Sequence, residues 1–74
     1  MPNRYSSIEI ETVLAKLQFH LTSQKGSHKK FKTDTGLICI LPANRKEIPV
    51  GTFRSILKQM QITNEEFKDL LNTK

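Results

Sequence analysis

The hydrophobic residues near the start of the chain repeat with the period of an α-helix. Four of them follow the i, i+3, i+4, i+7 spacing of one helix face: Ile10, Val13, Leu14 and Leu17. Ser6 and Ser7 can cap such a helix, and Glu9 falls in its first turn, where the helix dipole favours an acid. The pattern therefore predicts a helix over about residues 7–18.

The period then changes to that of β-strands. Apolar and polar residues alternate over 19–24, as in a half-buried strand, and a second strand is expected at about 27–33. A short apolar run over 37–41 predicts a third strand. Pro42 should end it, because proline has no N–H to donate to the strand ladder.

Helical spacing returns in the last third of the chain. Thr52 is expected to cap a helix with a continuous apolar face: Phe53, Ile56, Leu57 and Met60. The segment Thr63–Glu66 fits a capping box, in which the two side chains satisfy each other's free backbone N–H groups. A short last helix should follow, with Phe67, Leu70 and Leu71 on its apolar face.

Taken in order, these elements predict an α+β fold. A helix, a three-stranded antiparallel sheet, a second helix and a short extra C-terminal helix should pack with the helices on one sheet face, leaving the other face open. This α-β-β-β-α order resembles the fold of double-stranded-RNA-binding domains. With a length of 74 residues and no internal linker, the chain is expected to form a single domain over 1–74.

The turn between the first two strands determines which side chains share a sheet face. A two-residue turn at Lys25-Gly26 would pair His20 with Phe31 on one face, against the alternation of apolar residues. A three-residue loop over 25–27 instead pairs Leu21 with Phe31, and its central glycine can adopt the left-handed backbone that such loops need. We therefore expect the three-residue loop.

In that register Gln24 faces His28 across the hairpin. The open sheet face should then carry polar and basic side chains: His20, Thr22, Gln24, His28, Lys30 and Lys32. The apolar residues Phe19, Leu21 and Phe31 should point the other way, toward the helices.

Positive charge is concentrated in the middle of the chain. The net charge is +5, and residues 25–58 carry eight Lys or Arg against two acids, while the rest of the chain has a net charge of −1. Such a concentration attracts polyanions, most commonly the phosphates of nucleic acids. The residues expected to contact RNA are Lys25, Gly26, Ser27, Lys29, Lys30, Lys32, Arg45 and Lys46.

His28 is the candidate catalytic residue. A neutral imidazole can take the proton from a ribose 2′-hydroxyl, and neighbouring ammonium groups can stabilise charge on the phosphoryl oxygens. His20 would lie about 13 Å from His28 at about 3.3 Å per strand residue, too far to act as its paired acid. The two histidines have no cluster of carboxylates or cysteines around them in the sequence, so we expect no metal site and no other cofactor.

Three further features of the sequence indicate the cellular compartment. The lone cysteine, Cys39, cannot form an intrachain disulfide, and its apolar neighbours favour a reduced, buried thiol. No apolar run approaches the ~20 residues of a membrane span. The first seven residues are polar, unlike a signal peptide. These features favour the cytoplasm and no membrane partner.

Two blocks of the sequence resemble the signature of the HicA family of toxins. The first is Gln24-Lys25-Gly26-Ser27-His28 followed by Phe31, and the second runs from Pro42 through Gly51-Thr52-Phe53-Arg54-Ser55-Ile56-Leu57-Lys58. The resemblance covers residues 7–71. One difference is Asn44, at a position where family members often have a histidine.

The resemblance implies both an activity and partners. It implies the toxin of a type II toxin–antitoxin system, a metal-independent endoribonuclease that acts on messenger RNA with His28 as its catalytic residue. A HicB-type antitoxin would hold it inactive, and an oligomeric toxin–antitoxin complex is compatible with this pairing. The identity of the general acid stays open, because water, a lysine or the histidine itself could serve.

Two other classes of function remain open from the residues alone. One is a non-catalytic RNA-binding module of the double-stranded-RNA-binding type, in which His28 only contacts RNA. The other is a protein-interaction domain whose basic face docks an acidic partner. Cleavage assays on His28→Ala distinguish the first from an enzyme, and the absence of any RNA effect would favour the second.

Overall fold

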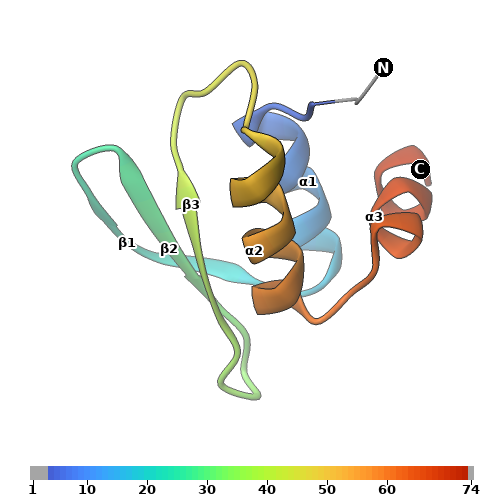
Figure 1. The fold of residues 1–74 in the computed structure, drawn as a ribbon. Helices are drawn as coiled ribbons and strands as arrows, with labels where there is room; N and C mark the ends of the chain where they lie inside the picture. The colour runs from blue at the N-terminus through green and yellow to red at the C-terminus, as the bar shows by residue number, and fades with distance from the viewer. Residues whose placement is uncertain (1–3, 74) are drawn as a thin grey trace.

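Six elements of secondary structure follow one another in the order that the sequence predicts. The structure, a computed structural model, describes residues 4–73. Its elements are α1 (Ser7–Lys16), β1 (His20–Lys25), β2 (His28–Lys32), β3 (Ile38–Pro42), α2 (Val50–Met60) and α3 (Asn64–Asn72). The strands form one antiparallel sheet in the order β1-β2-β3, and the helices lie to one side of it (Figure 1). The α+β fold predicted from the sequence is confirmed.

Capping explains where the first and last helices begin. The Ser6 hydroxyl accepts a hydrogen bond from the Glu9 N–H at 3.2 Å, and the Glu9 carboxylate accepts one from the Ser6 N–H at 2.9 Å. Thr63 and Glu66 form the same reciprocal pair at α3, as predicted. Because both boxes satisfy free N–H groups, each helix starts at a fixed residue.

The second helix starts earlier than predicted. Thr52 does not cap it: the N-cap is Pro49, which makes no side-chain hydrogen bond, and Thr52 lies within the first turn. Proline has a backbone angle already close to the helical value and no N–H to satisfy, so a helix can begin beside it without a polar cap. The first turn of α2 also contains no acidic residue.

The core lies between the sheet and the helices. Its buried members are Ile10, Val13, Leu14, Phe19, Phe31, Cys39, Leu41, Ile48, Phe53, Ile56, Leu57, Met60 and Phe67. Beside them Tyr5 packs 5.1 Å from Phe53 and 4.8 Å from Phe67 between ring centroids, within the usual range for aromatic pairs. Among residues 4–73, no helix is both long enough and apolar enough to cross a membrane.

The β1–β2 hairpin differs from the expected register at its tip. Leu21 pairs with Phe31 as predicted, but Lys25 rather than Gln24 pairs with His28, so the predicted three-residue loop is wrong. Gly26 and Ser27 form a two-residue turn in which Gly26 has φ of 60° at the first position, as a type II′ turn requires. The register shifts between Leu21 and Ser23, where a β-bulge absorbs one residue.

This bulge changes the set of residues on the open sheet face. The side chains that share it by register are His20, Ser23, Lys25, His28, Lys30 and Lys32. The placement of Gln24 on this face was therefore wrong, because Gln24 pairs with Lys29, whose side chain lies on the helix side. Thr22 lies at the bulge itself and has no partner on β2 in this register. Leu21 is also not a core residue: it is 52% exposed although its partner Phe31 is buried, because β1 is an edge strand of the sheet.

Candidate functional site

His28 is the first residue of β2 and sits between two other strand ends. It pairs with Lys25 at the end of β1 and with Pro42 at the end of β3. Directly opposed residues on antiparallel strands have Cβ atoms about 4.5–5.5 Å apart on one face, so Lys25 is the nearest strand lysine to this imidazole. His28 is exposed, as the sequence predicts.

The imidazole borders a small open pocket of about 140 Å³. Its lining comes from the ends of β2 and β3, the following loop and the first turn of α2: His28, Pro42, Arg45, Ile48, Pro49 and Thr52. The first turn of α2 has free backbone N–H groups and no acid, and Arg45 adds a full positive charge. The electrostatics of this pocket therefore favour an anion.

Partly buried hydrogen bonds hold the loop that carries Arg45. The Ser7 hydroxyl donates to the Pro42 carbonyl at 2.7 Å and accepts from the Arg45 N–H at 3.0 Å. The Ser7 N–H donates to the Arg45 carbonyl at 2.9 Å. The Ser27 carbonyl accepts from the Ala43 N–H at 2.6 Å, which attaches the hairpin turn to the same loop. The start of α1 thus fixes the loop beside His28.

A second, wider hollow lies on the α1 side of the same loop. It has a volume of about 460 Å³, and its lining residues are Ser6, Ile8, Glu11, Lys29, Asn44, Arg45 and Lys46. Arg45 lines both hollows, so they share one cation. Asn44 has φ of 58°, a left-handed conformation that asparagine tolerates better than most residues.

The predicted RNA-contacting residues fall into separate groups. Lys25 and Arg45 come together near His28, whereas Lys29 and Lys46 line the second hollow. The Lys29 ammonium lies 3.2 Å from a Glu11 carboxylate oxygen, on the helix side of β2. Two further lysines, Lys30 and Lys32, lie along the open face opposite Ile40 and Ile38.

The two turn residues have different structural roles. A Cβ added at Gly26 would meet no atom within 4 Å, so the glycine is needed for its positive φ and not for space. Ser27 contributes its backbone carbonyl to the contact with Ala43. Both residues keep the Lys25 and His28 side chains at the tip of the hairpin.

The second histidine stays apart from the first. His20 pairs with Lys32, which lies four residues along β2 from His28, or about 13 Å at 3.3 Å per residue. Within the described range 4–73, no group of three or more His, Cys, Asp or Glu side chains is arranged to hold a metal ion. The neighbours of His28 by strand pairing and pocket lining include Lys25 and Arg45, and among the described residues the lining of its pocket contains no Asp or Glu.

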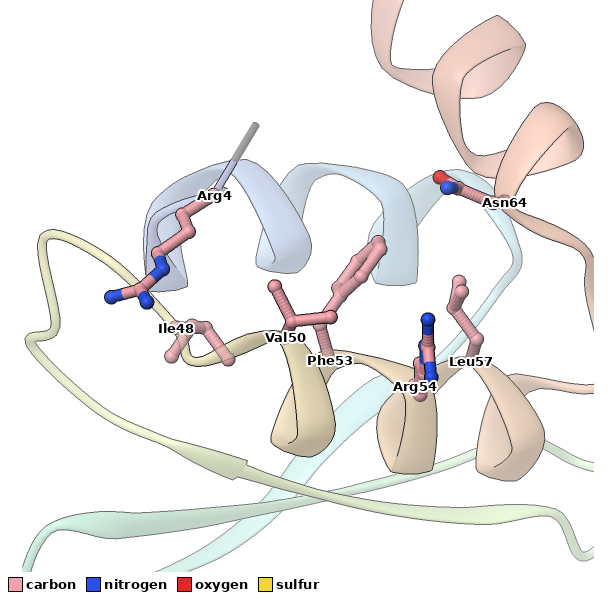
Figure 2. A pocket seen from close by; sticks show the side chains of 7 residues that line it. All are labelled: Arg4, Ile48, Val50, Phe53, Arg54, Leu57 and Asn64. Carbon is pink, nitrogen blue, oxygen red and sulfur yellow. The ribbon is translucent and has the colours of Figure 1, made fainter. Parts of the chain in front are cut away.

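A third hollow, of about 220 Å³, lies between Arg4, the helix α2 and the start of α3 (Figure 2). Arg4 and Arg54 flank an apolar floor that includes Val50, Phe53 and Leu57. None of the predicted catalytic or RNA-contacting residues lines it. The chemistry-bearing side chains gather instead around the loop that carries Arg45.

Sequence reasoning missed three residues at the site. Ser7 was considered only as a helix cap, Thr52 was considered as a cap and as part of the family resemblance, and Glu11 was not considered as a site residue. The sequence signal for Ser7 was the pair of serines before α1, because one hydroxyl suffices for the cap and the other is left for a tertiary contact. Nothing in the sequence alone pairs Glu11 with Lys29.

Comparison with protein families agrees with the geometry. The family model described as HicA toxin of bacterial toxin-antitoxin matches residues 8–62, which include all of α1 except its first residue, the whole sheet and α2. A search of curated proteins finds no match. The family match spans most of the 74-residue chain. It contains His28 and the loop between β3 and α2 that carries Arg45. The chain therefore belongs to the HicA family of toxins of bacterial toxin–antitoxin systems.

Proposed function

We propose that this toxin is an endoribonuclease that cleaves messenger RNA at the His28 pocket, and that a HicB-type antitoxin inhibits it. The observation that carries the proposal is the position of His28. It is an exposed imidazole beside Lys25 and Arg45, at an open pocket that favours an anion. This is the set of groups that ribose-assisted cleavage of a phosphodiester needs.

The proposed reaction uses the substrate's own 2′-hydroxyl as nucleophile. Neutral His28 accepts the 2′-hydroxyl proton while the 2′ oxygen forms a bond to the adjacent phosphorus. The bond from phosphorus to the 5′ oxygen of the next nucleotide breaks. That oxygen takes a proton from the imidazolium, from water or from a lysine. The products are a 2′,3′-cyclic phosphate and a free 5′-hydroxyl, and no metal ion is required.

Positive charge around His28 supports the transition state and the binding of the strand. Lys25 pairs with His28 across the hairpin and Arg45 lines the same pocket, so they are assigned to the phosphoryl oxygens, where negative charge develops. The residues assigned to the flanking phosphates are Gly26, Ser27, Lys29, Lys30, Lys32 and Lys46. An antitoxin that covers the His28 pocket would block this access.

Replacement of His28 tests the proposal directly. His28→Ala should lose at least about 100-fold in cleavage rate, the usual scale for removal of a general base. Its thermal unfolding should match that of the wild type, because the side chain is exposed. His20→Ala is the matched control, an exposed histidine on the same sheet, and should cleave normally.

Product analysis then separates the proposal from its alternatives. We expect a 2′,3′-cyclic phosphate end, resistance of RNA with deoxyribose at the scissile position, and full activity in the presence of a chelator. Full activity of His28→Ala, or loss of activity on chelation, would refute the mechanism. RNA binding without any cleavage by the wild type would favour a non-catalytic RNA-binding module. Inhibition of growth without any effect on RNA would favour a protein-interaction domain.

A further inference from the structure

The wider hollow beside the His28 pocket has the construction of a ligand site. Three segments converge on it: the first turns of α1, the inner face of β2, and the loop over residues 44–46. Its volume of about 460 Å³ falls within the ~300–1,000 Å³ typical of small-ligand sites. It therefore offers more room than the His28 pocket, whose volume is about 140 Å³.

The charged residues of this hollow differ in whether they are already paired with an opposite charge. Glu11 holds the Lys29 ammonium through both carboxylate oxygens, at 3.2 and 3.3 Å, so this pair is close to neutral. Arg45 and Lys46 are exposed at the rim. The rim is thus cationic and the interior presents a neutral, hydrogen-bonding pair. That distribution suits a ligand with an anionic group outside and a neutral polar group inside.

An apolar side chain completes the lining. Ile8 is 75% exposed, more than any other large hydrophobic residue that the structure describes as exposed, although its neighbours Ser7 and Ile10 are buried. An exposed aliphatic chain beside an arginine offers a surface for the flat face of a nucleobase, since bases stack on guanidinium planes and on apolar side chains. Asn44 places amide donor and acceptor groups at the same rim.

The two hollows share one cationic residue, Arg45, whose backbone is held in place. Arg45 lines both, and its backbone N–H and carbonyl are both held by Ser7. In a nucleotide strand, phosphates alternate with nucleosides, so a strand can place a phosphate in one hollow and a base in the next. A strand with one phosphate beside Arg45 in the His28 pocket would continue on the α1 side of the loop, where the second hollow lies.

We propose that the hollow between α1, Lys29 and Asn44 binds the nucleotide next to the cleaved phosphodiester. This inference deepens the proposed function and rests on it for the identity of the strand as substrate. The base packs against Ile8, its edge meets Asn44 and the Glu11–Lys29 pair, and the outer phosphate meets Lys46. Such contacts would make the hollow the source of any preference for the base beside the cleavage site.

Binding measurements test the hollow independently of cleavage. The ligand is a short single-stranded RNA with deoxyribose at the scissile position, which cannot be cut by 2′-hydroxyl attack. Ile8→Ala should weaken binding by about five- to twentyfold, because it removes apolar surface that the base would cover, and each buried methylene group is worth about fourfold in affinity. Leu21→Ala is the matched control, because it removes another exposed aliphatic side chain outside the hollow, and it should bind normally.

A second variant addresses base preference. Asn44→Gly removes the amide while keeping the left-handed backbone accessible, so it should fold normally. Cleavage of an oligonucleotide panel, varied at the base on each side of the scissile bond, should show reduced discrimination at one of those positions. Asn72→Gly, at the exposed end of α3, should leave discrimination unchanged.

The outcomes separate this proposal from the proposed function. If Ile8→Ala and Asn44→Gly bind and discriminate like the wild type while His28→Ala fails to cleave, the hollow is not a nucleotide site and the cleavage mechanism stands. If both variants cleave normally but escape inhibition by the antitoxin, the hollow is a protein contact and the proposal is overturned. If His28→Ala cleaves normally, weakened binding by Ile8→Ala still supports the hollow.

Discussion

The helical layer and the β1–β2 hairpin differ in what their residues contact. In the helical layer the apolar residues that face the sheet are enclosed, and Ile10, Val13 and Phe67 expose no surface, whereas Ile8 at the start of α1 is the exposed exception. All six residues of β1 are exposed, and the hairpin turn lies on the side away from the helices (Figure 1). Stability therefore resides in one region and the proposed chemistry in the other.

Substitutions should therefore affect the stability of one region and the chemistry of the other separately, except where the two regions are joined. The joint is the loop between β3 and α2, which Ser7 fastens to α1 and which Ala43 fastens to the hairpin turn. A substitution in the core should change stability without changing the chemistry of the folded protein. A substitution at an exposed position of the hairpin should do the reverse, and one at the joint should do both.

The largest effect on stability is expected at Phe67. Phe67→Ala would leave a cavity beside Tyr5 and Phe53, and aromatic-to-alanine changes in a core cost about 3–5 kcal/mol. Urea denaturation should show this loss, while Leu21→Ala in the hairpin should stay within about 0.5 kcal/mol of the wild type. A loss at Phe67 no greater than that at Leu21 would contradict the division between the two regions.

Alkaline pH should weaken the core through Cys39. Burial raises the pKa of its thiol from 9.0 to about 11. The unfolded chain releases this proton at lower pH than the folded chain, so the free energy of unfolding should fall as pH rises from 9.0 to about 11. The full loss for a shift of this size is up to about 3 kcal/mol.

Comparison with Cys39→Ala isolates this contribution from every other effect of alkaline pH on the protein. The variant should be less stable at pH 8 but should lose less stability than the wild type between pH 9.0 and about 11. If the free energies of unfolding of the wild type and Cys39→Ala fell in parallel over this pH range, the thiol would not be protected by the fold. At neutral pH the folded wild type should also react slowly with thiol reagents, because the thiolate is the reactive form.

Ser7 is expected to show both kinds of effect. Ser7→Ala leaves the Pro42 carbonyl without its donor and the Arg45 N–H without its acceptor, which should cost about 1–3 kcal/mol. Because Arg45 borders the His28 pocket, cleavage by the folded fraction should fall as well. Ser55→Ala, an exposed serine on α2, is the control for both measurements. A stability loss with unchanged cleavage would remove Ser7 from the positioning of the site.

The sequence predicted the helical layer better than the hairpin, for a physical reason. Helix faces repeat with a fixed period, and reciprocal caps such as Thr63–Glu66 mark their boundaries, so α1 and α3 began where expected. In the hairpin the expected register satisfied the alternation of Leu21 and Phe31 but could not anticipate a bulge. A bulge lets both a two-residue turn and that pairing exist, and no residue type specifies it.

The candidate site was predicted residue by residue but not as an arrangement. His28 and the lysines are visible in the sequence as chemistry, and their exposure follows from the strand period. The proximity of Lys25 to His28 depends on the turn, and that of Arg45 depends on three hydrogen bonds to Ser7. Such contacts between distant segments leave no periodic signal.

The smallest expected effect distinguishes lysines within the hairpin itself. Each phosphate contact on single-stranded RNA contributes about 0.7 to the slope of log affinity against log salt concentration. Lys25 is an exposed lysine beside His28, whereas the Lys29 ammonium already lies against the Glu11 carboxylate. Lys25→Gln should therefore reduce the slope by about 0.7, and Lys29→Gln should reduce it by less.

The measurement is a salt titration of binding to RNA that carries deoxyribose at the scissile position. Lys68→Gln on α3 controls for the loss of one positive charge far from the site and should leave the slope unchanged. If Lys25→Gln leaves the slope unchanged, the phosphates do not follow the hairpin, and Arg45, Lys46 and Arg54 become the alternative path. If Lys29→Gln has the larger effect, RNA must displace Lys29 from Glu11 on binding, and the helix side of the sheet would then take part in the chemistry assigned to the hairpin.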